Sequence, residues 1–130
     1  VLAIAAGVTP RPIFTQSAYT RAIDFGALAM AEGSPEDARE RLGLLFDQGR
    51  VRRPPLRPDA AVLIGCRDDA LVPPEQSEAL HALWPGSDLR WLEGGHVASV
   101  LVHRAPLRQA LRAAFAKLVA PCSRPPVAPC

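Results

Sequence analysis

Two short, wholly apolar runs constrain the fold of this chain more than any other feature. The first covers residues 1–6 and ends at Gly7, and the second covers residues 60–64 and ends at Gly65. Strands that are apolar at every position are typical of a parallel sheet covered on both faces, because neither face meets water. An alternating run over residues 88–93 predicts a further strand.

Helical patterns alternate with these strands. The predicted helices cover residues 17–31, 35–48, 74–84 and 98–119, with Ser34 as the N-cap of the second and Pro106 as a kink or restart in the last. In the last helix, the residues at helical spacing that we expect to pack across the sheet are Leu101, Leu107, Leu111, Phe115 and Leu118. Strands that alternate with helices predict an α/β fold with a parallel sheet and right-handed crossovers.

The size of the chain sets a limit of one domain. With 130 residues and 48% hydrophobic content, it can bury one core. We predict a partial domain over residues 1–120, followed by a proline-rich, disordered tail over residues 121–130.

The charge pattern does not favour a nucleic-acid partner. The net charge is +2, Lys117 is the single lysine, and the basic cluster at residues 50–57 lies among prolines, which predicts a solvated linker. No apolar run approaches the roughly 20 residues that a membrane-spanning helix needs. Val1 starts no signal peptide, and because it is not methionine we expect the chain to begin inside a longer protein; the cellular location is left open.

The cysteines give no metal-binding pattern. Cys66, Cys122 and Cys130 form no C-x-x-C pair and have no zinc-type spacing with the histidines. We therefore predict no metal and no cofactor, with Cys66 as a small apolar core residue.

A histidine follows the last predicted strand. The sequence Gly94-Gly95-His96 places an imidazole on the exit loop of that strand, and the glycines allow a sharp turn without side chains that shield the ring. A histidine in that position can transfer protons. The other histidines, His81 and His103, have no partner in the sequence, and we assign them no role.

A carboxylate loop follows the earlier apolar strand. Asp68 and Asp69 come directly after Gly65-Cys66-Arg67, 27 residues before His96 in the case of Asp69, which leaves room for one intervening helix. The carboxyl ends of neighbouring parallel strands bring such loops together. Adjacent side chains on a turn point in different directions, so we expect Asp69 to face His96 and keep Asp68 as the alternative, each with a turn-stabilising role as the competing interpretation.

The order of acid and then histidine is that of hydrolases with a nucleophile, an acid and a histidine in sequence. The sequence contains no G-x-S-x-G motif, so we expect the nucleophile to lie upstream of Val1.

The stretch from Leu63 to Phe115 resembles the C-terminal part of the alpha/beta hydrolases, most closely the eukaryotic alpha/beta-hydrolase domain-containing protein 18 family. The matching motifs are Asp69-Ala70 with Val72-Pro73, Trp84-Pro85-Gly86, Arg90 with Leu92-Glu93-Gly94-Gly95-His96, and Arg108-Gln109-Ala110 ahead of Phe115. A fainter similarity covers Phe14-Thr15, Ile23 and Leu28, whereas Leu71 stands where an aromatic residue is common.

The resemblance implies Asp69 as the triad acid, His96 as the general base, and a serine nucleophile that this sequence does not contain. The implied activity of the complete protein is ester hydrolysis, with a small-molecule or lipid ester as substrate. This chain alone is not expected to be active. The alternative is a non-catalytic scaffold of the same fold that binds a partner or a lipid.

Overall fold

The structure is a computed structural model that describes residues 1–120 of the chain. Its elements, in chain order, are β1 Leu2–Ile4, α1 Arg11–Thr15, the 3₁₀ helix η1 Ala18–Ala22, α2 Phe25–Glu32, α3 Pro35–Asp47, the 3₁₀ helix η2 Pro58–Ala60, β2 Val62–Cys66, α4 Pro74–Leu83, β3 Asp88–Leu92, α5 His96–Val102 and α6 Arg104–Val119. The predicted tail, with Cys122 and Cys130, lies outside the described residues.

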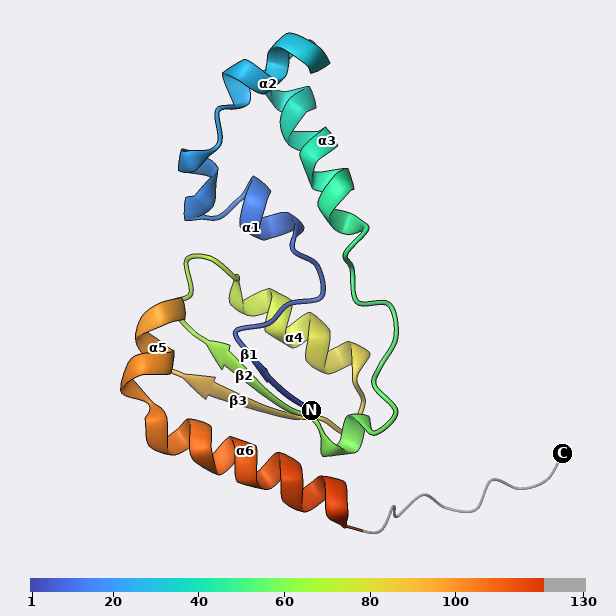
Figure 1. Cartoon of the computed structure of the whole chain (residues 1–130), viewed down its shortest axis with the longest axis vertical. Coiled ribbons are helices and arrows are strands. Elements are labelled where there is room, and N and C mark those ends of the chain that lie inside the picture. Colours follow the sequence, from blue (N-terminus) through green and yellow to red (C-terminus); the bar gives the residue numbers. More distant parts are fainter. Residues whose placement is uncertain (121–130) are drawn as a thin grey trace, which may run out of the picture.

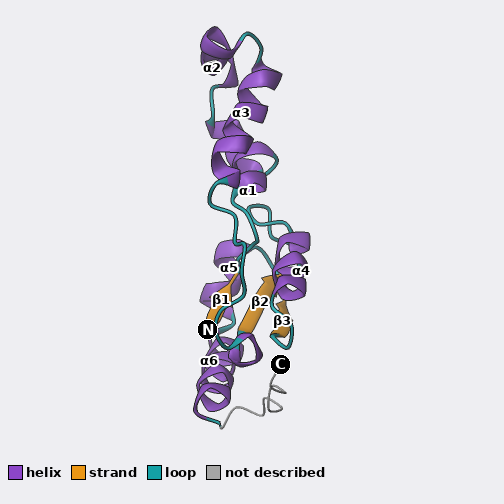
Figure 2. Cartoon of the chain, turned by 90° about the vertical axis from the view of Figure 1, so that its right-hand side faces the viewer, coloured by secondary structure: helices purple, strands orange, loops and turns teal. Residues whose placement is uncertain are grey.

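The three strands form one parallel sheet in the order β1-β2-β3. Helix α4 covers one face of the sheet, and α5 and α6 lie on the other (Figures 1 and 2). The predicted α/β class is confirmed by this arrangement. All three strands run in the same direction, so the loops that follow β2 and β3 leave the sheet at the same edge.

The apolar strand β2 explains both layers of the core. Successive side chains of a strand point to opposite faces, so Leu63 packs toward α4, where it meets Leu80 and Trp84. Val62 and Ile64 point the other way and pack against Ala110 and Ala114 of α6. All five residues of β2 are buried, as the wholly apolar pattern predicts.

Gly65 allows a close contact inside this sheet. It pairs with Trp91 of β3, and a Cβ atom at position 65 would overlap the indole ring. Part of the indole ring therefore occupies the space that a side chain at position 65 would need. Arg67 is the first residue after β2, and its guanidinium lies 5.3 Å from the centre of the same ring.

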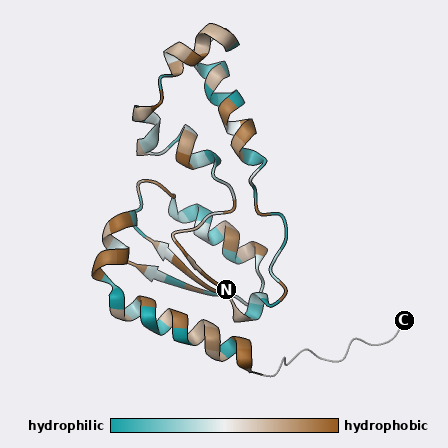
Figure 3. Cartoon of the chain, viewed as in Figure 1, coloured by the Kyte–Doolittle hydropathy of each residue, from teal (hydrophilic) through white to brown (hydrophobic). Residues whose placement is uncertain are grey.

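Helix α6 buries a different stripe from the one that its leucines predict. The side chains that reach the sheet are the small Ala110 and Ala114, with Leu107 packed beside them. Leu101 of α5 and Leu111, Phe115 and Leu118 of α6 are exposed, so their predicted packing across the sheet is wrong. Small residues let the helix approach the sheet closely, and the large ones project beside it. Figure 3 shows the resulting alternation of hydrophobic and hydrophilic turns along α6.

The segment between β1 and β2 forms a helical extension, α1 to α3, that projects away from the sheet (Figure 1). The single helix predicted over residues 17–31 is wrong, because a second helix start at Asp24 divides the range into η1 and α2. The Ser17 hydroxyl accepts the Tyr19 amide at the start of η1. Ile23 is extended, and the Asp24 carboxylate then caps α2 by accepting the Ala27 amide.

Helix α3 begins and ends close to the predicted positions. The Ser34 hydroxyl accepts the amide of Asp37, and Pro35 occupies the first helical position. At the other end, Asp47 accepts hydrogen bonds from the Thr9 hydroxyl and from Arg11. The Thr9 hydrogen bond, followed by that of Arg11, holds the pKa of Asp47 below its usual value. This cluster fixes the end of α3 against the chain that leaves β1.

No helix within residues 1–120 has both the length and the apolar character needed to cross a membrane.

Candidate active site

The acid loop starts where β2 ends, at Cys66. The Asp69 side chain is 1% exposed, and its Oδ1 atom accepts the amides of Leu71 and Val72 at 2.8 and 2.9 Å. These two bonds close a turn of the kind that aspartate often forms. They also orient the carboxylate, since Oδ1 is engaged by the loop and Oδ2 is directed out of it.

The histidine loop starts where β3 ends, at Leu92. Gly94 has a φ of +94°, a left-handed conformation that favours glycine, and this turn leads directly into α5. His96 is the first residue of α5, two residues earlier than the predicted start of that helix. Its ring is therefore held at the junction of a strand and a helix, at the carboxyl edge of the sheet.

The two loops meet through their side chains. Nδ1 of His96 lies 2.7 Å from Oδ2 of Asp69. A carboxylate accepts, so Nδ1 carries the proton and Nε2 of the neutral ring is left as an acceptor. Nε2 has no hydrogen-bond partner within the described residues, and the His96 side chain is 35% exposed. The arrangement can hold one tautomer and stabilise the imidazolium that would form on protonation.

Asp68 has a different partner from Asp69. Its Oδ2 atom accepts the amide of Gly94 at 3.1 Å, so the exposed Asp68 carboxylate bonds the backbone of the histidine loop. The structure thus brings Asp69, and not Asp68, to the imidazole. The catalytic roles of Asp69 and His96 stay predictions.

The described serines are engaged elsewhere. Ser17, Ser77 and Ser99 donate to backbone carbonyls, Ser34 caps α3, and Ser87 pairs with His81. None of them is hydrogen-bonded to His96. No serine within residues 1–120 therefore completes a triad with the two side chains.

The chain matches a known protein family over most of its length. The family described as alpha/beta hydrolase domain containing 18 matches the chain over residues 12–117. This range contains the acid loop, the histidine loop and most of the helical extension. The chain belongs to the alpha/beta hydrolase domain containing 18 family. Three parallel strands with helices on both faces are consistent with part of an alpha/beta-hydrolase fold.

Several residues outside the predicted pair have contacts that the sequence did not indicate. His103, to which we assigned no role, lies at the junction of α5 and α6, and its Nε2 atom is 3.0 Å from the Glu93 carbonyl. Ser99 is fully buried and donates to the same carbonyl. Both contacts reach back from α5, or from its C-terminal end, to the loop that follows β3, so neither has a motif of its own.

The predicted core residues behave differently from one another. Cys66 is a buried free thiol, as predicted, and Trp84 is buried in the layer below α4. Trp91 is partly exposed beneath Arg67. Within residues 1–120, no group of three or more His, Cys, Asp or Glu side chains could hold a metal ion.

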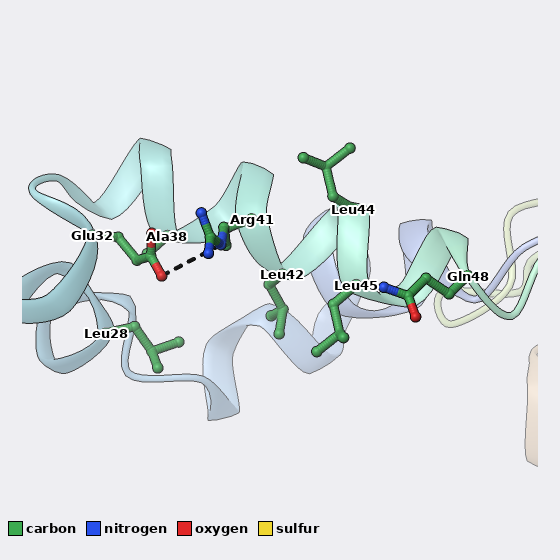
Figure 4. A pocket seen from close by; sticks show the side chains of 8 residues that line it. All are labelled: Leu28, Glu32, Ala38, Arg41, Leu42, Leu44, Leu45 and Gln48. Atoms are coloured by element: carbon green, nitrogen blue, oxygen red, sulfur yellow. Dashed lines mark ion pairs between the residues drawn. The ribbon is translucent and has the colours of Figure 1, made fainter.

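A pocket of about 500 Å³ lies in the helical extension of this family member, between α2 and α3. Figure 4 shows the side chains that line it, most of them apolar, together with an ion pair between Glu32 and Arg41 at 3.6 Å. Its lining residues are Leu28, Glu32, Ala38, Arg41, Leu42, Leu44, Leu45 and Gln48. Neither Asp69 nor His96 lines it, so it is separate from the candidate active site.

Proposed function

We propose that Asp69 and His96 are the acid and the general base of a serine-type ester hydrolase, and that the nucleophilic serine lies upstream of Val1. The observation that carries the proposal is the 2.7 Å contact between His96 Nδ1 and an Asp69 carboxylate that two backbone amides already orient. The other ring nitrogen, Nε2, has no hydrogen-bond partner within the described residues and is left to accept a proton. Membership of a hydrolase family supports the same assignment.

The chemistry follows the usual two stages. Nε2 of His96 takes the proton of the serine hydroxyl as its oxygen attacks the acyl carbonyl, and Asp69 stabilises the resulting imidazolium. His96 then gives that proton to the departing alcohol, which leaves an acyl-serine. In the second stage His96 takes a proton from water, the hydroxyl attacks the acyl-serine, and the serine regains its proton as the acid is released. Upstream amides would form the oxyanion hole.

The free edge of β1 supports an upstream position for the serine. The Val62 amide donates to the Val1 carbonyl, and the Ala5 amide donates to the Ile64 carbonyl. Since bonding alternates along a parallel strand, the amide and carbonyl groups of Leu2 and Ile4 point to the opposite side. No described residue pairs with that side. A further strand can therefore extend the sheet beside β1, and a turn at its carboxyl end would face the same edge as His96.

The other edge of the sheet is less suited to such an addition. β3 carries the charged side chains Asp88 and Arg90, which pair with each other at 2.7 Å, and Lys117 lies 3.4 Å from the same carboxylate. Charged side chains on an edge strand discourage pairing. β1 is wholly apolar, and a groove of about 160 Å³ beside it is lined by Val1, Leu2, Leu111, Ala114, Phe115 and Leu118. This groove would be covered by the additional strand and the chain that follows it.

The surroundings of His96 favour an apolar acyl group. Helix α5, which His96 begins, exposes Val97, Val100, Leu101 and Val102. Exposed apolar side chains next to the general base would contact the hydrocarbon part of an ester. We therefore propose a lipid or other apolar ester as the substrate class.

Labelling of the intact protein with a serine-directed fluorophosphonate tests the proposal. We expect one labelled serine, located by mass spectrometry between two glycines on a strand-to-helix turn upstream of Val1. His96→Ala should abolish the labelling, whereas His81→Ala, on α4 and paired with Ser87, should not. A folded protein that takes up no label would contradict the hydrolase proposal.

The second candidate is a non-catalytic scaffold that binds an apolar partner or lipid. The pocket between α2 and α3 favours it, because apolar residues line the pocket and Leu44 and Leu45 remain exposed. In that case the intact protein would bind a fluorescent fatty acid, and it would not hydrolyse the corresponding fatty-acid ester. Leu42→Glu, which places a charge among the lining residues, should then weaken the binding and leave fluorophosphonate labelling absent in both proteins.

A further inference from the structure

One peptide group of the histidine loop is held from both of its sides. The carbonyl of Glu93 and the amide of Gly94 belong to the same peptide plane. The Asp68 carboxylate accepts the amide at 3.1 Å. On the other side, Ser99 Oγ and His103 Nε2 lie 3.2 and 3.0 Å from the carbonyl oxygen. One side chain from the acid loop, one from α5 and one from the junction of α5 and α6 thus fix the orientation of one peptide plane.

That orientation determines where His96 lies. The plane comes just before the left-handed turn at Gly94, and His96 follows two residues later as the first residue of α5. A rotation of the plane would change the direction in which the chain enters α5 and would move the imidazole relative to Asp69. Gly94 has no side chain to resist such a rotation, so the resistance comes from the three contacts.

The acid loop therefore contacts the histidine loop twice through consecutive residues. Asp69 is buried and bonds the ring, whereas Asp68 is exposed and bonds the backbone 26 residues away. The alternating directions of neighbouring side chains allow both contacts at once. The two bonds together set the position of the ring as well as its tautomer.

We infer that Asp68 is a positioning residue for His96, acting through the Glu93–Gly94 peptide, with His103 holding the opposite side of the same peptide. This inference rests on the proposed function in that it assigns the positioned ring to the general base. Asp68 does not contact the ring, and its part is to keep Nδ1 of His96 within reach of Asp69. A misplacement of about 1 Å in a reacting group lowers a rate on the order of a hundredfold.

The test compares three substitutions of Asp68 in the intact protein. Asp68→Ala removes the acceptor, and Asp68→Ser keeps a turn-forming side chain that is too short to reach the Gly94 amide. Asp68→Asn removes the charge and keeps an acceptor oxygen. Glu78→Gln, an exposed position on α4, is the control for the loss of one carboxylate. The readouts are the low-field proton resonance of His96 Nδ1–H in histidine-labelled protein and the rate of fluorophosphonate labelling, with thermal unfolding as the check on folding.

We expect Asp68→Ala and Asp68→Ser to broaden or shift the Nδ1–H resonance and to lower the labelling rate about tenfold to a hundredfold. Asp68→Asn and Glu78→Gln should stay close to the parent protein in both readouts. His103→Phe should act in the same direction as Asp68→Ala, and the double variant should lose less than the sum of the two, because both act on one peptide.

Each remaining outcome decides the inference. An unchanged Nδ1–H resonance in folded Asp68→Ala overturns it, whatever the labelling shows. If Asp68→Asn and Asp68→Ala lower the labelling rate equally, the inference is also overturned, because the effect would then come from the lost charge and not from the lost hydrogen-bond acceptor. If the parent shows the resonance and Asp68→Ala loses it, but neither protein takes up label, the positioning role stands and the hydrolase proposal fails. If the parent lacks the resonance, the positioning inference fails, and the hydrolase proposal is then decided by the labelling alone.

Discussion

The Nδ1 atom of His96 lies 2.7 Å from Oδ2 of Asp69, although 27 residues, a helix and a strand separate the two in the chain. The contact exists because β2 and β3 are parallel neighbours, which brings their following loops to one edge of the sheet. The Asp69 side chain is buried and the ring is partly open. The pair thus combines a fixed acid with a base that a third group can approach.

Replacement of the proposed base should remove the activity. His96→Ala leaves no group to take the serine proton, so we expect the rate of ester hydrolysis by the intact protein to fall at least about 10³-fold. A chromogenic ester assay measures the effect, and circular dichroism checks that the fold is retained. Turnover within a few fold of the parent would assign the base to another residue.

Replacement of the proposed acid should act through the tautomer of His96. Asp69→Asn keeps an Oδ1 acceptor for the Leu71 and Val72 amides but can present an NH₂ group to the ring. We expect turnover to fall on the order of 10³–10⁴-fold, with a small change in stability. Asp68→Asn is the matched comparison, because it makes the same chemical change one residue away. If the Asp68 variant were the one to lose turnover, the assignment of the acid would be reversed.

Much of this geometry follows from local patterns. The apolar strand β2, the Ser34-Pro35 start of α3 and the glycines before His96 each act within a few residues, so the sequence predicts them directly. The order of the acid and histidine loops then places both at one edge. What the sequence does not indicate are contacts that depend on the packed structure, such as the bonds from Asp68 and His103 to one peptide of the histidine loop.

The incorrect predictions have local physical reasons as well. The residues 17–31 have helical spacing, but the Asp24 side chain stabilises a new helix start and ends the periodic run. In α6, spacing alone cannot distinguish which of two faces meets the sheet. The structure buries Ala110 and Ala114, because a closely approaching helix needs small residues at the contact.

Crowding at Gly65 predicts a loss of stability on substitution. A methyl group in Gly65→Ala would overlap the Trp91 ring, so the ring or the strand must shift. We expect the free energy of unfolding to fall by about 1–3 kcal/mol, as for other overpacked cores. Thermal or chemical unfolding measures it. In a protein that already carries Trp91→Leu, Gly65→Ala should lower the free energy of unfolding by less than it does in the parent. An equal loss in the two proteins would exclude the ring as the cause.

The charges that join β3 to α6 predict a pH dependence of stability. The hydrogen bond from Arg90, with Lys117 nearby, holds the pKa of Asp88 below its usual value. Because the pKa is lower in the folded chain than in the unfolded one, this contribution is present above about pH 4 and is lost as the pH falls through the folded pKa. Asp88→Asn should therefore cost about 0.5–1 kcal/mol near neutral pH and less at an acid pH below about 4. Denaturant unfolding of both proteins at the two pH values checks this, and a constant difference would contradict it.

Phe115 reports whether the groove beside β1 is covered in the intact protein. The side chain is 60% exposed in this chain and lines the groove with Leu111 and Leu118. If an additional strand and its following chain fill the groove, Phe115→Ala should destabilise the intact protein by about 3–5 kcal/mol. Leu56→Ala, at a position that is 99% exposed, is the control and should change stability by less than about 0.5 kcal/mol. A similarly small effect at Phe115 would mean that the groove stays open.

The neck of the helical extension is narrow: the chain leaves β1 and returns toward β2 side by side, joined by a bond from the Val51 amide to the Val8 carbonyl at 2.7 Å. The extension also contacts the acid loop, where the Ala18 amide donates to the Ala70 carbonyl at 3.2 Å, so η1 is tied to the chain that carries Asp69. By contrast, the side-chain hydrogen bonds of α3 in the described residues stay within the extension and the chain that leads into it from β1. Sequence changes in α2 and α3 can therefore alter what the extension admits or excludes while the loop that carries Asp69 keeps its contacts.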